Sequence, residues 1–219
     1  MSDASFYSHF AASVPPETNT WATLQTLCAF IGPPIDGVAA GFSLATSRVS
    51  SHPSAAKVLG AISGGLWLGG AVVSELGNAP RVTLASVANG FCGVAGAFSL
   101  TAPFLLDQTQ RNVAYSSAAA WLVNGAADIA CAVGNPQRNL VSRLLQGGSG
   151  AANMAAAGLS AASVDASARN DSVKAATLGT VSSMLWVVGA AAALGAESAA
   201  RSDALNRTRR PGSEPGSAV

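Results

Sequence analysis

Few residues in this chain have the types and spacing that enzymatic chemistry requires. The two histidines, His9 and His52, fall in expected terminal or loop segments, and neither has a partner at metal-site or nucleophile–base spacing. The segment GSG at 148–150 imitates a dinucleotide-binding loop but follows no predicted strand. Three cysteines lie in separate apolar stretches without a C-x-x-C pair, so we expect small buried side chains rather than disulfides or a zinc site: Cys28, Cys92 and Cys131. The sequence therefore predicts no enzyme: no catalytic residue, no metal and no cofactor, with bound lipids as the only expected ligands.

Three acidic residues are the remaining candidates for chemistry, because each lies within or beside an apolar segment. Asp36 follows a Gly-Pro-Pro sequence at which we expect the helix to break and to free backbone groups. Glu75 and Asp128 stand at corresponding positions, eight and seven residues after a tryptophan. Carboxylates inside a membrane are costly and often mark an ion or proton pathway. The alternative for Glu75 and Asp128 is that they lie near helix ends, at the depth of the lipid headgroups, where they are hydrated or paired with Arg81 and Arg138.

The composition indicates what kind of elements position these residues. Only 11% of the 219 residues are charged, against roughly 25% in ordinary soluble domains, while 49% are hydrophobic and 23 are glycine. A formal net charge of +1 excludes the electrostatic footprint of a nucleic-acid-binding protein. The apolar content excludes disorder for the body of the chain. A chain with so little charge cannot cover a soluble surface, so we predict a membrane protein or one enclosed by partners.

The charged residues divide the chain into six apolar segments, mostly near the ~20 residues that a bilayer requires. We predict an all-α, polytopic membrane helical bundle of about six short Gly/Ala-rich transmembrane helices. The expected organisation is an N-terminal extension over 1–17, a helical membrane domain over 18–200 and a polar C-terminal tail over 201–219. The segments lie near 18–46, 58–76, 82–106, 112–133, 140–164 and 175–197, and the fifth has the weakest apolar character.

The spacing of bulky and small residues indicates how these helices face their surroundings. Leu84, Val87, Phe91 and Val94 step by three and four along one stripe, which suits a face toward lipid. Small residues allow close approach of helices in a membrane. The glycines expected to serve helix packing are Gly37, Gly41, Gly60, Gly64, Gly65, Gly69, Gly90 and Gly93. The tryptophans expected as anchors at the membrane interface are Trp67, Trp121 and Trp186.

Internal similarity predicts a three-fold repeat of helical hairpins. The sequence GVAAGFSLA over 37–45 resembles GVAGAFSLT over 93–101, and MAAAGLSAA over 154–162 resembles both more faintly. Between these stretches, each of three segments carries a tryptophan shortly after a serine. Two helix types alternating three times, in units of roughly 55 to 60 residues, would produce this pattern.

Targeting and orientation follow from the basic residues. The first 17 residues contain no Lys or Arg, so we expect no cleavable signal or transit peptide and an integral membrane protein directed by its own spans. Seven Lys and Arg residues fall on the side that holds the termini and five on the opposite side. This difference favours termini on the cytosolic or equivalent side.

Three functions fit these features. The leading hypothesis is a non-catalytic accessory or structural subunit of a larger membrane complex, such as an energy-transducing one, whose partners are other membrane subunits and lipids. A small-solute or ion transporter or channel using Asp36, Glu75 and Asp128 is the alternative, disfavoured because no span carries a basic residue or a cluster of polar groups. A secreted translocator or toxin that inserts into membranes is the second alternative.

Overall fold

The computed structural model describes residues 18–49, 51–78 and 82–208, and over these residues the chain is helical without strands. The predicted N-terminal extension over 1–17, Arg81 and residues 209–219 lie outside the described residues. The elements are α2 (Thr18–Arg48), α3 (Pro53–Asn78), α4 (Leu84–Thr101), the short 3-10 helix η1 (Ala102–Phe104), α5 (Asp107–Gly134), α6 (Leu140–Ala168) and α7 (Ser172–Thr208).

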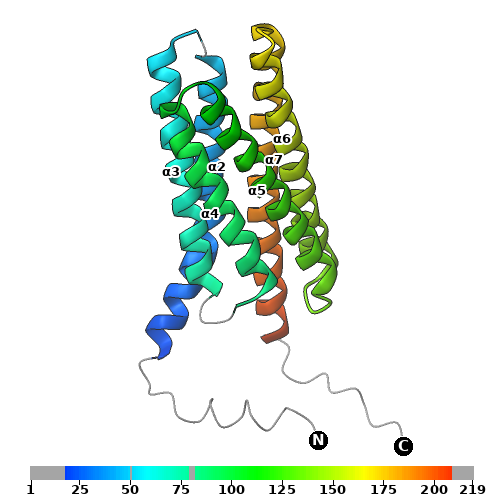
Figure 1. The fold of residues 1–219 in the computed structure, drawn as a ribbon. Helices are drawn as coiled ribbons and strands as arrows, with labels where there is room; N and C mark the ends of the chain where they lie inside the picture. Colours follow the sequence, from blue (N-terminus) through cyan, green and yellow to red (C-terminus); the bar gives the residue numbers. More distant parts are fainter. Residues whose placement is uncertain (1–17, 50, 79–81, 209–219) are drawn as a thin grey trace, which may run out of the picture.

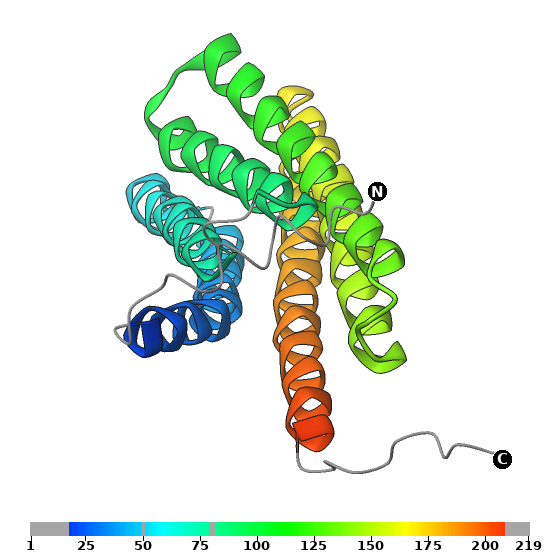
Figure 2. The same ribbon diagram turned by 90° about the horizontal axis from the view of Figure 1, so that it is seen from below.

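The six α-helices run alternately up and down and form a ring in chain order (Figures 1 and 2). Each helix packs against the next, and α7 also packs against α2, which closes the ring. The start of α2 and the end of α7 therefore lie at the same end of the bundle, with the end of α3, the start of α4 and the α5–α6 connection (Figure 1). We call this the terminal end; the other three connections lie at the opposite end.

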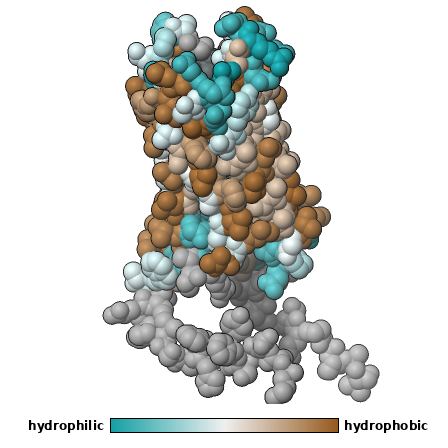
Figure 3. Space-filling model, viewed as in Figure 1, coloured by the Kyte–Doolittle hydropathy of each residue, from teal (hydrophilic) through white to brown (hydrophobic). Residues whose placement is uncertain are grey.

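The face of the bundle seen in Figure 3 is mostly apolar along its middle, whereas the more hydrophilic residues gather toward its two ends. Leu84, Val87, Phe91 and Val94 are all exposed on α4, as the stripe predicts. By length and composition, the described helices include five that could cross a membrane; α6, in the segment with the weakest apolar character, does not qualify. The arrangement is that of a multi-pass helical membrane bundle.

Glycine contacts set how closely the helices approach. A Cβ atom at Gly64 of α3 would collide with the backbone nitrogen of Leu100 in α4. Between α5 and α6, a Cβ at Gly125 would stand 2.5 Å from the carbonyl oxygen of Gly150. A Cβ at Gly150 would likewise stand 2.5 Å from the carbonyl oxygen of Gly125. The α3–α4 and α5–α6 crossings therefore depend on residues without a side chain.

The glycines predicted from sequence divide into two groups. Gly64 lies at a tight crossing, and looser contacts surround Gly60, Gly93 and Gly37, with nearest side-chain atoms 3.4, 3.5 and 3.9 Å from an added Cβ. The other four would meet nothing within 4 Å: Gly41, Gly65, Gly69 and Gly90. These four do not pack helices within this chain, because they lie on the outward side of their helices. On α4 the buried stripe is instead Ala88, Cys92, Ala95 and Gly96.

Helix boundaries differ from the prediction at two places. The expected break before Asp36 is wrong, because α2 stays helical through Pro33 and Pro34 and accommodates them by bending (Figure 1). The first eight residues of the predicted polar tail, 201–208, continue α7 as a helix. Arg201 explains the extension: its guanidinium donates to the carbonyl of Thr26 at 2.6 Å and lies 4.9 Å from the centre of the Phe30 ring, both in α2.

We predict that Gly64→Ala lowers the free energy of unfolding by about 1–3 kcal/mol, because the added methyl group meets backbone that cannot rotate away. The matched variant Gly69→Ala, on the open side of the same helix, should change it by less than about 0.5 kcal/mol. Unfolding of both purified variants in mixed detergent micelles measures the difference. Equal stability of the two variants would contradict the close α3–α4 approach.

Candidate functional site

Three tryptophans from alternate helices meet on the axis of the ring. The ring centroids of Trp67 and Trp121 are 4.6 Å apart at an interplanar angle of 74°, and Trp186 lies 6.3 and 5.7 Å from them. Trp67 and Trp121 are only 4% and 2% exposed. The sequence prediction that these residues are interface anchors is wrong, because they point inward and fill the space that a ring of small residues leaves at its centre.

Serine hydroxyl groups join the helix pairs on the far side of the tryptophans from the terminal end. Ser63 donates to the carbonyl of Ala39 at 2.8 Å, Ser117 to that of Ala95 at 3.0 Å, and Ser182 to that of Ala156 at 2.7 Å. Each serine stands four residues before one of the three tryptophans. These bonds link α2 to α3, α4 to α5 and α6 to α7. Each hydroxyl group thus has a hydrogen-bond acceptor within the protein.

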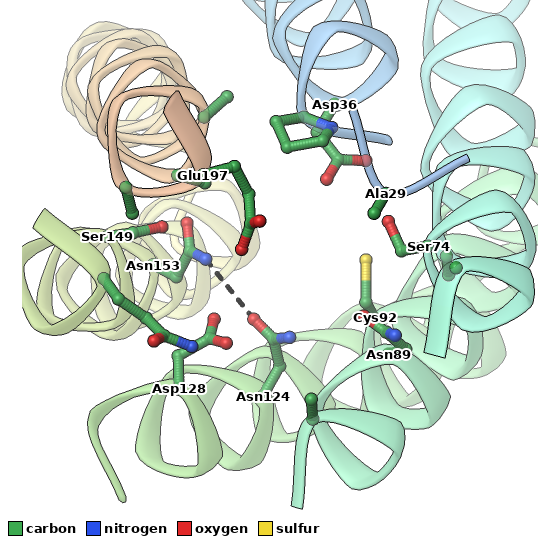
Figure 4. Close-up of a pocket in the computed structure, with 18 of the residues that line it drawn as sticks. Ala29, Asp36, Ser74, Asn89, Cys92, Asn124, Asp128, Ser149, Asn153 and Glu197 are labelled. Carbon is green, nitrogen blue, oxygen red and sulfur yellow. Dashed lines mark hydrogen bonds between the residues drawn. The ribbon is translucent and has the colours of Figure 1, made fainter. Parts of the chain in front are cut away.

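A cavity of about 350 Å³ occupies the other half of the bundle, from the tryptophans toward the terminal end. All six helices contribute to its wall, and polar side chains from several helices converge on it (Figure 4). Its polar and charged lining residues are Asp36, Ser74, Asn78, Asn89, Asn124, Asp128, Arg138, Gln146, Ser149, Asn153 and Glu197.

Asp36 is the most unusual group in this wall. Its Oδ1 atom is buried and has no hydrogen-bond partner. The carboxyl group lies against Gly70 of α3, where an added Cβ would collide with Oδ1. Pro33 and Pro34, one turn before it, have no backbone N–H and so remove the helical donors for the carbonyls of Ala29 and Phe30. This stretch of α2 therefore combines a carboxylate with weakly satisfied backbone acceptors.

Asn124 and Asn153 form a hydrogen-bonded pair across the cavity wall (Figure 4). The Asn153 Nδ2 group donates to Asn124 Oδ1 at 3.3 Å, and Asn124 Nδ2 donates to the carbonyl of Ala88 at 2.9 Å. Asn153 lies against Gly189 of α7, where an added Cβ would be 2.6 Å from its Oδ1. Asp128 lies one turn beyond Asn124 on α5 and faces the same space (Figure 4).

The Asp128–Arg138 pair proposed from sequence is wrong, whereas Arg81, the partner proposed for Glu75, lies outside the described residues. Arg138 forms an ion pair with Glu197 at 2.9 Å, not with Asp128. Glu75 accepts a hydrogen bond from Asn89 Nδ2 at 3.1 Å and does not line the cavity itself. Of the three acidic candidates, the structure brings Asp36 and Asp128 to one cavity and leaves Glu75 behind Asn89.

Several lining residues were not predicted from the sequence, because no single span carries a cluster of polar groups and the cluster is assembled from different helices. Each helix contributes only one to three of these polar residues, and they gather only when the ring closes. The sequence did contain a signal: Asn89, Asn124 and Asn153 are polar amide residues within segments that are otherwise mostly apolar. Among the described residues, no group of three or more His, Cys, Asp or Glu side chains could hold a metal ion.

Comparison of the chain with models of protein families, with curated proteins and with solved structures finds no match. The class that fold and site define is thus a multi-pass helical membrane bundle with a polar internal cavity.

We predict that Trp121→Ala lowers the free energy of unfolding by about 3–5 kcal/mol, because it leaves a cavity at the contact point of three helices. Trp21→Ala is the control, since Trp21 is 48% exposed near the start of α2 and should cost less than about 0.5 kcal/mol in detergent. Near-ultraviolet circular dichroism during thermal unfolding reports both. A small effect at Trp121 would mean that the tryptophans do not hold the ring together.

Proposed function

We propose that the protein is a membrane carrier or channel that takes a small cationic solute or ion into its central cavity from the terminal end. The observation that carries this proposal is the convergence of Asp36 and Asp128 on one cavity inside an apolar ring. This reverses the order of the two leading hypotheses from sequence, because polar groups that no single span gathers do converge on one cavity.

Electrostatics favour a cation. The charged residues that line the cavity are Asp36, Asp128, Glu197 and Arg138. Because Arg138 pairs with Glu197, it does not pair with either aspartate. Buried charges without a counter-ion are expensive in a low-dielectric environment, and a positive solute supplies the missing charge. The half of the bundle beyond the tryptophans is joined by serine–carbonyl bonds, so the cavity leads inward from one side only. A carrier that opens its two sides in turn, or a gated channel, would have this form at rest.

We also propose that the three helix hairpins are repeats of one unit. Supporting this, the serine–carbonyl bonds join equivalent positions in the internally similar stretches, at Ala39, Ala95 and Ala156. Asp36, Cys92 and Asn153 likewise occupy the position before each stretch, and all three line the cavity. Repeated units place their ligand site on the shared axis, as in many transporters.

We predict that Asp36→Asn and Asp128→Asn each reduce the transport current at least about tenfold, because each removes a charge that compensates a cation in the cavity. Purified protein in liposomes on a solid-supported membrane is given steps of Na⁺, K⁺, choline and pH. Asp165→Asn is the matched control, since Asp165 is exposed at the opposite end and should leave the current unchanged. No current from the intact protein, or equal currents from all variants, would contradict a transport role.

A second function, the accessory subunit, is favoured by the outward face of α6. A helix in lipid usually presents bulky apolar side chains, but this face becomes smooth after Leu144, which is 65% exposed. Over residues 145–162 its exposed residues are Gly148, Ala151, Ala155, Gly158 and Ala162. Such a face allows the backbone of another helix to approach closely. We propose that α6 is where a partner subunit would pack, if the protein works within a complex.

We predict that Ala155→Leu abolishes co-migration with partner subunits, because the larger side chain holds a neighbouring helix away. Val72→Leu on α3, where Val72 is 54% exposed and already bulky, is the control. The measurement is native size after mild-detergent extraction, with mass spectrometry of the co-migrating proteins. A homogeneous particle of this chain alone would exclude the accessory role, and recovery without detergent would contradict the membrane assignment.

A further inference from the structure

We propose that the central cavity binds a small organic ammonium ion, held by Asp36 and Asp128 beside Trp67 and Trp121. This inference rests on the proposed transport function, for which it names the class of substrate. It depends on the chemistry of the cavity floor, which the transport proposal does not use.

The floor of the cavity is aromatic. Trp67 and Trp121 line it, and their edge-to-face contact turns the two indole planes 74° apart. The negative faces of aromatic rings attract ammonium groups, and tryptophan does so best. Aromatic side chains beside a carboxylate are the usual recognition surface for substituted ammonium ions, since the ring contacts the alkyl groups and the carboxylate balances the charge.

The lining suits an organic cation better than a metal ion. Hard cations such as Ca²⁺ require six or more oxygen ligands at short range. Among the described residues no cluster of three metal-binding side chains exists, and the two carboxylates come from different helices, α2 and α5. A space of about 350 Å³ lies at the lower end of the range for small-molecule pockets. A bare ion would leave most of this space empty, whereas a small amine or quaternary ammonium ion would occupy it.

The environment of Asp36 leaves its charge without compensation from the protein. Its Oδ1 atom is buried against Gly70 without a donor, while the residue as a whole is only half-buried and lines the cavity. Buried polar groups without a partner are rare in folded proteins. An ammonium ion in the cavity would compensate the charge of this carboxyl group.

The test compares two ligands of equal shape. Choline and its uncharged carbon analogue 3,3-dimethylbutan-1-ol differ in the charge at one atom. The protein carries four tryptophans, so a Trp21→Phe background leaves only the three central ones as fluorescent reporters. Titration of this purified full-length variant in detergent should give saturable quenching by choline, with at least tenfold weaker binding of the analogue. Asp36→Asn, which keeps the shape of the side chain, should weaken choline binding at least tenfold, and Asp165→Asn should not.

Equal binding of choline and its analogue would overturn the proposal, because the cavity would then select shape and not charge. Absence of choline binding by a protein that retains its native circular dichroism would also overturn it. If Asp36-dependent currents of protons or inorganic cations persist in that case, the transport proposal stands without the ammonium site. Choline binding that depends on Asp36, with no current in liposomes, would support the site and contradict transport.

Discussion

The contact among three tryptophans on the axis is the interaction on which the rest of the structure depends. A ring of six helices has a central space that glycine, alanine and serine cannot fill, and neighbouring helices approach closely only because those residues are small. The indole rings of Trp67, Trp121 and Trp186 close this space at one level. Below that level the space stays open and becomes the cavity; above it, serine hydroxyl groups and close backbone contacts take over.

This division explains why the polar residues lie where they do. The chain has few charges, and those within the spans cannot face lipid without a large cost. The ring offers one place that avoids lipid, which is its axis. Asp36 and Asn153 reach it because Gly70 and Gly189 on the paired helices leave room for their polar atoms. Asp36 gains a site next to the aromatic floor, and it lacks a partner from the protein itself.

The sequence predicted the elements well, because hydrophobic segments and the bulky stripe on α4 depend on local composition. It also identified Asp36 and Asp128 as candidates, since a carboxylate in an apolar segment is conspicuous. What it could not give were relations across the ring. The inward direction of Trp121, the pairing of Arg138 with Glu197, and the Asn124–Asn153 bond all depend on how different helices pack against one another. The prolines of α2 misled because a break and a bend have the same local signal, and the packing against α7 decides between them.

The way in which each polar group is covered also bears on the synthesis of the chain. Asp36 on α2 is covered by Gly70 on α3, and Asn153 on α6 by Gly189 on α7, so the cover comes from the same hairpin in both cases. A hairpin leaving the ribosome and entering the bilayer thus carries its own shield for the costly side chain. The ring, by contrast, is completed only when Arg201 near the end of the chain reaches the carbonyl of Thr26 near its start. The cavity, whose wall takes residues from all six helices, is complete only when the three hairpins have come together.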